Sequence, residues 1–148
     1  MYLVVNKDNR IVASAGYEIN AEDCAKRQEK VIYIDDSFYV SKMVGAIYIE
    51  HEPYFIEAPS PYHKIVNGDY VLDEEGTANY WKAVRTFRNK LIAQTDWTQL
   101  SDVTISQEEA EKWLLVRQEL RNITNETSDP ESAFTVLESY AKQIMGNI

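Results

Sequence analysis

The stretch VLDEEGTANYWKAVRTFRNKL, residues 71–91, separates two different textures of sequence. Before it, short clusters of Val, Ile, Tyr and Phe alternate with Asn, Asp, Gly and Pro, which is typical of short strands joined by tight turns. After it begins, the apolar spacing changes from two to 3.6 residues. The sequence therefore predicts an α+β protein with a β-rich lobe over residues 1–76 and a helical lobe over residues 77–148.

The β-rich lobe is expected to contain antiparallel hairpins. One joins residues 1–5 to residues 11–15 through a turn whose Asn and Asp side chains tolerate turn geometry. Another is centred on Asn67-Gly68, a pair that readily takes the positive φ angles of a type I′ turn. Between them we expect a short helix and three strands, at residues 21–30, 31–34, 45–49 and 54–56.

The helical lobe is expected to begin with a helical hairpin and to end with a third helix. The first helix follows a polar break at residues 73–76, is capped by Thr77 or Asn79, and runs to about Gln94. Its apolar face contains Trp81, Val84, Phe87 and Leu91.

The second helix of this lobe begins at a capping box formed by Ser106 and Glu109. Residues 122–128 are expected to form a polar linker. The third helix then begins with Asp129 as its N-cap and Pro130 in its first position, and it ends at Gly146. The apolar faces of these helices contain Ala110, Trp113, Val116, Leu120 and Ile123, and then Phe134, Leu137, Ala141 and Ile144.

Charge and composition disfavour several classes of function. The 148 residues include 15 Lys and Arg against 24 Asp and Glu, a net charge of −9, which has the wrong sign for a protein that coats nucleic acid or an anionic membrane. No apolar run approaches the roughly 20 residues of a membrane span, and the first residues lack a secretory signal pattern. We therefore expect a cytoplasmic protein without nucleic-acid or membrane partners.

Residues with catalytic or metal-binding chemistry show no recognisable spacing. His51 and His63 belong to no metal-ligand motif, and Cys24 is a lone thiol, best explained as a small buried apolar residue. The acidic runs at residues 35–36 and 73–75 could supply a glycosidase pair, but a solvated acidic surface explains them better. We expect no enzyme activity, no metal and no cofactor.

The connector over residues 96–102 places a large aromatic side chain, Trp97, outside both predicted helices. We favour the interpretation that Trp97 folds back to close the helical hairpin, with Asp96 and Asp102 at the helix ends; direct contact with a partner is the alternative. The same two interpretations, internal ion pairs or a binding edge, hold for the nearby arginines. They are Arg88, Arg117 and Arg121.

Residues 88–123 resemble the phage tail assembly chaperone family. The motifs that carry the resemblance are Arg88, Leu91-Ile92-Ala93, Asp96-Trp97-Thr98-Gln99, Asp102, Ser106, Trp113 and Val116-Arg117-Gln118-Glu119-Leu120-Arg121-Asn122. Val116 and Asn122 depart from the Tyr and Asp usual at these places. A helix predicted over residues 130–145 replaces the usual Trp-Pro ending.

The resemblance implies a non-enzymatic chaperone that binds a tail-fibre or receptor-binding protein in the host cytoplasm and aids its folding or trimerisation. A β-rich lobe could contribute by strand addition. The expected partner-binding residues are Arg88, Asp96, Trp97, Gln99, Asp102, Arg117 and Arg121. A permanent component of the virion tail, capping or adapting the fibre or baseplate, is the alternative, and homo-oligomerisation stays open. A glycan hydrolase, or a nucleic-acid-binding regulator using the stripe Lys82, Arg85 and Arg88, has less support.

Overall fold

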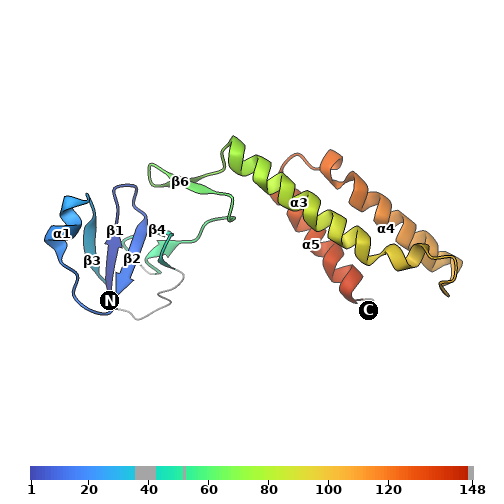
Figure 1. Ribbon diagram of the computed structural model, residues 1–148, viewed down its shortest axis with the longest axis horizontal. Helices are drawn as coiled ribbons and strands as arrows, with labels where there is room; N and C mark the ends of the chain where they lie inside the picture. Colours follow the sequence, from blue (N-terminus) through green and yellow to red (C-terminus); the bar gives the residue numbers. More distant parts are fainter. Residues whose placement is uncertain (36–42, 52, 147–148) are drawn as a thin grey trace. The chain divides into compact units, whose positions relative to one another are not determined.

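A computed structural model describes residues 1–35, 43–51 and 53–146 (Figure 1). The chain divides into two compact units, Met1–Gly76 and Thr77–Ile148, which are described separately below. The described strands all belong to the first unit, and the second unit is helical. The predicted α+β class is therefore confirmed.

A three-stranded antiparallel sheet in the order β2-β1-β3 organises the first unit. It contains β1 (Tyr2–Val5), β2 (Ile11–Ala15) and β3 (Lys30–Tyr33). The predicted hairpin between β1 and β2 is confirmed, with Tyr2 opposite Ala15. Its turn is held by the Asn6 side chain, whose Oδ1 accepts hydrogen bonds of 3.0 Å from the backbone N–H groups of Asp8 and Arg10.

The core of the first unit lies on one face of this sheet. Leu3 and Val5 of β1 are fully buried there, and alternation along the strand turns Val4 to the other face, where it is 4% exposed. The core cluster contains Leu3, Val5, Ile11, Ile34, Met43 and Tyr48. The central strand is therefore buried on both faces.

Short elements complete the first unit. The helix α1 (Ala21–Lys26) is shorter than predicted, because the chain reverses at Gln28, which has a φ of 59°, before β3 begins. The strands β4 (Ile47–Tyr48) and β5 (Phe55–Ile56) pair with each other. All three strands expected between the two hairpins are present; β3 is shifted by one residue from its predicted bounds, and β4 and β5 are shorter than predicted.

The second predicted hairpin is confirmed as β6 (Lys64–Val66) and β7 (Asp69–Val71). Asn67 and Gly68 at its turn have φ values of 50° and 82°, the left-handed pair that the Asn-Gly sequence predicted. The Tyr70 hydroxyl accepts a hydrogen bond from the Ile47 N–H at 3.1 Å and donates one to the Ile56 carbonyl. This hairpin is therefore attached to the β4–β5 pair.

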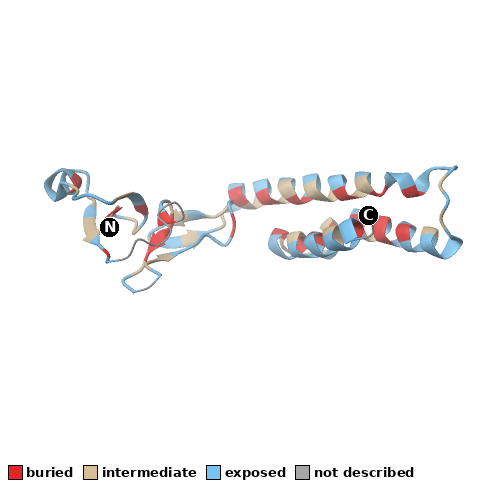
Figure 2. Ribbon diagram, turned by 90° about the horizontal axis from the view of Figure 1, so that it is seen from below, coloured by how far each residue is buried: buried red, intermediate tan, exposed pale blue. Residues whose placement is uncertain are grey.

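The second unit contains most of α3 (Glu74–Gln94), a short 3₁₀ helix η1 (Asp96–Gln99), α4 (Gln107–Glu126) and α5 (Pro130–Gly146). Each helix contributes an apolar stripe to a common core (Figure 2). Aromatic contacts connect α3 to α5, with Phe134 centred 5.2 Å from Phe87 and 6.0 Å from Tyr80. The buried apolar residues are Tyr80, Val84, Leu91, Trp113, Val116, Leu120, Ile123, Ala133, Leu137 and Ile144.

The start of α3 differs from the prediction. Asp73 is the residue that caps it, because Asp73 Oδ1 accepts the Gly76 N–H at 2.9 Å, and the assignment of Thr77 or Asn79 as the cap is wrong. The expected break at residues 73–76 is instead the first turn of the helix. Glycine is required at position 76, since a Cβ there would collide with the carbonyl oxygen of Tyr62. An ion pair with Lys64, and then the Gly76 hydrogen bond, lower the pKa of Asp73.

The linker predicted over residues 122–128 is also corrected, since α4 continues to Glu126. Ile123 is 4% exposed and extends the buried stripe by one turn, so burial outweighs the low helix propensity of the Asn and Thr residues around it. The helix ends where the Thr127 N–H and hydroxyl both donate to the Ile123 carbonyl.

A polar contact joins α5 to α4, because the Tyr140 hydroxyl of α5 donates a hydrogen bond to the Glu119 carboxylate of α4. Desolvation and this bond raise the pKa of Tyr140 to about 12.

The N-terminus of α5 has the predicted cap. Asp129 Oδ1 accepts the Ser132 N–H and Oδ2 accepts the Ser132 hydroxyl, both at 2.8 Å. The backbone hydrogen bond and then the hydroxyl hydrogen bond lower the pKa of the Asp129 carboxyl. Pro130 occupies the first helical position, where its missing N–H costs nothing.

We predict that this cap makes stability depend on pH. Because the folded pKa of Asp129 lies below its ordinary value, its charge stabilises the fold above about pH 4, and this stabilisation is lost as the pH falls through the lowered pKa. Denaturant unfolding of the wild type and of Asp129→Asn should show the wild type as more stable at pH 7, with the difference shrinking toward pH 2. A difference that is constant with pH would contradict this role.

Candidate protein-binding site at the helical hairpin

The end of α3 is held by an arginine from α4. Arg117 Nη1 lies 3.0 Å from the Ile92 carbonyl oxygen, 2.7 Å from Thr95 Oγ1 and 2.8 Å from Asp96 Oδ1. Arg117 is 7% exposed, and Thr95 is fully buried. We call these four residues, Ile92, Thr95, Asp96 and Arg117, the Arg117 clasp.

The sequence around the clasp folds in this way because the last carbonyls of a helix need donors from outside it. The Thr95 hydroxyl donates to the Ile92 carbonyl, and the Thr98 hydroxyl donates to the Thr95 carbonyl, both at 2.7 Å. Gln99 Nε2 in turn donates to Thr98 Oγ1 at 2.9 Å. These bonds form η1, and a guanidinium at this end also complements the negative end of the α3 dipole.

The hydrogen bonds of the clasp matter more than its ion pair. Asp96 is exposed over 64% of its side chain, so water screens its attraction to Arg117. The bonds to Ile92 and Thr95 are shielded from water, so Arg117 supplies a charged donor to two buried oxygens that otherwise bond to each other and, in the case of the Ile92 carbonyl, to the Thr95 N–H. Arginine suits this place because its long side chain brings one permanently charged nitrogen, Nη1, among the three oxygens, which share its two N–H groups.

Trp97 does not close the hairpin as predicted. It is 40% exposed, and its ring meets the buried Trp113 edge-on at 5.9 Å and 68°. The buried side chain of η1 is Thr98, at 5% exposure. The 3₁₀ turn directs Thr98 inward, so closure is achieved by Thr98 and the Arg117 clasp, while Trp97 covers only the edge of Trp113.

The predicted binding residues fall into two groups, those in or beside the Arg117 clasp and those outside it. Arg117 and Asp96 are in the clasp, and Gln99 bonds to Thr98 beside it. The Arg88 guanidinium donates to Asn89 Oδ1 at 3.1 and 3.0 Å. Asp102 and Arg121 are exposed, and neither they nor Arg88 form an ion pair within the described ranges.

Several large apolar side chains in η1, just after it and in α4 are exposed. Leu114 and Leu115 in α4 are 55% and 56% exposed, and Leu100, which follows η1, is 59% exposed. We call Trp97, Leu100, Leu114 and Leu115 the tip residues. The sequence prediction missed these leucines, although Leu114 and Leu115 fall outside the buried stripe of α4 and could have been recognised on that ground. Exposed apolar groups of this kind mark protein contacts more often than catalytic sites.

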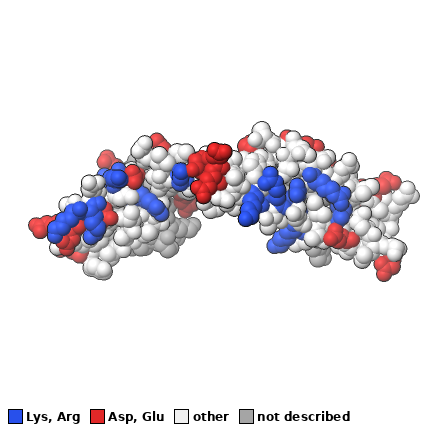
Figure 3. Space-filling view, turned by 45° about the horizontal axis from the view of Figure 1, so that its top comes forward, with Lys and Arg blue, Asp and Glu red and all other residues white. Residues whose placement is uncertain are grey.

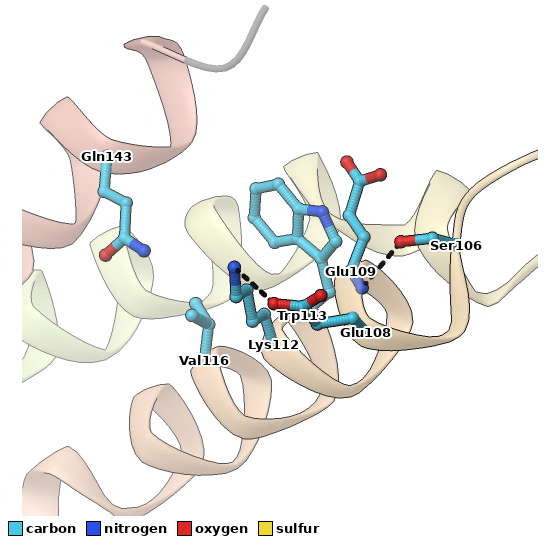
Figure 4. Close-up of a pocket in the computed structure, with 7 residues that line it drawn as sticks. All are labelled: Ser106, Glu108, Glu109, Lys112, Trp113, Val116 and Gln143. Carbon is cyan, nitrogen blue, oxygen red and sulfur yellow. Dashed lines mark hydrogen bonds and ion pairs between the residues drawn. The ribbon is translucent and has the colours of Figure 1, made fainter.

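A groove of about 480 Å³ lies between the start of α4 and the last turns of α5 (Figure 4). Trp113 and Val116 form its apolar part, and Gln143 lies on the α5 side. Two interactions lie at its polar rim. Lys112 forms an ion pair with Glu108 at 3.4 Å, and the Ser106 hydroxyl accepts a hydrogen bond from the Glu109 N–H at 3.1 Å.

Residues 81–136 match the family model of the phage tail assembly chaperone protein. The matched segment contains the Arg117 clasp and all four tip residues, and it confirms the resemblance for this part of the chain. The match supports a chaperone role in phage tail assembly, with a phage protein as partner. No curated protein and no solved structure matches the chain.

The described residues contain neither a metal-binding cluster nor a membrane-spanning helix. Within residues 1–35, 43–51 and 53–146, there is no group of three His, Cys, Asp or Glu side chains arranged to hold a metal ion. Among the helices of the described part, none has the length and apolarity needed to cross a membrane.

The different burial of the two tryptophans gives a stability prediction. Trp113→Ala should cost on the order of 3 kcal/mol of unfolding free energy because its ring is 7% exposed. Trp97→Ala should cost about 1 kcal/mol, since its ring is partly in water already. Denaturant unfolding of both variants checks this, and equal losses would contradict the assignment of Trp97 to the surface.

The clasp gives a second stability prediction. Arg117→Lys should destabilise the protein by about 1–3 kcal/mol, because the lysine side chain is one bond shorter and its ammonium cannot take the position of Nη1 among these three oxygens. Arg121→Lys, one turn away and exposed, is the matched control and should change stability by less than about 0.5 kcal/mol. If Arg117→Lys unfolds at the same denaturant concentration as the control, the clasp does not hold the hairpin.

Proposed function

We propose that the protein is a non-enzymatic chaperone that binds a phage tail-fibre or receptor-binding protein and promotes its folding or trimerisation. The observation that carries the proposal is that the segment matching the chaperone family is a helical hairpin with an internal polar clasp and exposed apolar side chains. Such a hairpin presents a fixed apolar surface to a partner.

A chaperone of this kind would assist fibre proteins, which assemble slowly. Trimeric, β-rich fibres depend on contacts between distant parts of the sequence, so they assemble slowly and expose strand edges that aggregate. A partner that covers apolar surface during this interval raises the yield of correct trimers. The acidic character of the whole chain, with a net charge of −9, helps to keep the complex soluble.

The proposal divides the predicted binding residues by role. Arg117, Asp96 and Gln99 maintain the end of the hairpin, since their hydrogen bonds are made within the chain. Trp97 and the exposed leucines contact the fibre protein. Binding takes place in the host cytoplasm during assembly, without nucleic acid or membrane as partner.

Co-expression tests this function. The phage's own tail-fibre protein, produced with the wild-type chain, should yield several-fold more soluble trimer than when it is produced alone, measured by analytical ultracentrifugation. Leu114→Gln/Leu115→Gln should remove most of this gain, because it replaces two exposed apolar contacts without disturbing the buried stripe.

Val136→Gln, at an exposed apolar position of α5, is the matched control and should keep the gain. An equal trimer yield with and without the chain would contradict the proposed function.

Quantitative mass spectrometry of purified virions distinguishes a chaperone that leaves from a permanent component of the particle. A departing chaperone is absent from the particle, whereas a stoichiometric amount in the particle would replace the proposal with a permanent fibre or baseplate component.

A further inference from the structure

The helix α3 is basic in an otherwise acidic protein. Between Gly76 and Thr95 the sequence contains Lys82, Arg85, Arg88 and Lys90 but no Asp or Glu, although the whole chain has a net charge of −9. Figure 3 shows Lys and Arg side chains gathered on one face of the helical unit. This concentration of positive charge has no role in the Arg117 clasp.

These cations are not neutralised within the fold. Elsewhere, Lys26, Arg27, Lys64, Lys112 and Arg117 each pair with a carboxylate. By contrast, no cation of α3 has a carboxylate within ion-pair distance in the described part of the chain, and Arg88 bonds only to the neutral amide of Asn89. Lys82 and Arg85 are exposed. Their charges are therefore available to a partner.

The geometry makes a short row of positive charge. Lys82, Arg85 and Arg88 follow one another at steps of three residues, so they form a slanted row about 9 Å long on the helix surface. We call these three residues the basic stripe. On α4, Arg121 lies one turn after Arg117, whose guanidinium reaches α3, and it adds a further exposed cation to the helical hairpin.

We propose that the basic stripe, with Arg121, docks an acidic polypeptide segment of the partner, one with three or four Asp or Glu side chains close together. Charge complementarity selects such a segment and accelerates its encounter with the helix. The identification of the partner as a phage tail protein rests on the proposed function, but the recognition chemistry does not.

A protein segment fits the stripe better than a nucleic acid. Duplex DNA carries about one negative charge per 1.7 Å along its axis, so it extends far beyond a row of about 9 Å. The rest of such a polyanion would meet a protein surface that is acidic on the whole, with 24 Asp and Glu in the chain. A short acidic peptide can occupy the stripe without this repulsion.

Fluorescence anisotropy on the full chain tests the docking with a labelled octaglutamate peptide and, separately, a labelled 12-base-pair duplex DNA. At low salt, Lys82→Gln/Arg85→Gln/Arg88→Gln should weaken peptide binding at least tenfold, and added salt should weaken wild-type binding steeply. Lys7→Gln/Lys26→Gln/Lys142→Gln is the matched control, since it removes the same charge from exposed positions elsewhere and should change binding less than twofold.

Three results would overturn the proposal. They are equal peptide affinities for the two triple variants, tighter stripe-dependent binding of the duplex than of the peptide, or sedimentation showing that the stripe binds a second copy of the chain. Both triple variants are checked for a wild-type circular dichroism spectrum, and Arg88→Gln alone replaces a variant that fails to fold. Because no fibre protein is present, a failure here leaves the co-expression result intact, and the reverse also holds.

Discussion

The hydrogen bonds from Arg117 to the last turn of α3 are the interaction on which the helical unit depends. A 21-residue helix must end before the chain can return, and its final carbonyls need donors in a buried place. Arg117 supplies one guanidinium nitrogen to Ile92, Thr95 and Asp96 together. Next to it, the Thr98 N–H and hydroxyl both bond to the Thr95 carbonyl in the 3₁₀ turn of η1, and Trp97 lies edge-on against Trp113.

This arrangement separates the residues that maintain the hairpin from those that face outward. Two polar residues of the chaperone motif, Thr98 and Arg117, are buried and bonded within the chain, as is the neighbouring Thr95. The exposed surface is made by apolar tip residues and by the basic stripe of α3. This separation suits a protein that recognises an incompletely folded partner. The buried residues keep the geometry of the hairpin fixed while the exposed residues contact the partner.

Local signals in the sequence predicted much of the fold, and long-range contacts account for most of the corrections. Asn67-Gly68 and Asp129-Pro130 specify their turn and cap through nearby backbone geometry, so both were predictable. Asp73 as the cap of α3 was missed, because the need for glycine at position 76 comes from Tyr62. The clasp joins residues 21 to 25 positions apart, so spacing could suggest an Arg117–Asp96 pair but not the buried carbonyl and hydroxyl that matter more. The exposed Leu114 and Leu115 could have been recognised as well, because the apolar stripe predicted for α4 leaves both of them outside it.

The most direct test of this account is amide hydrogen exchange, followed residue by residue, in the wild type and in Arg117→Lys. If the clasp holds the hairpin, exchange should accelerate by at least tenfold at the end of α3 and in η1, residues 92–99, while amides of the β1–β3 sheet keep their rates. Unchanged protection over residues 92–99 in the variant would show that the hairpin closes without Arg117 and would contradict the account.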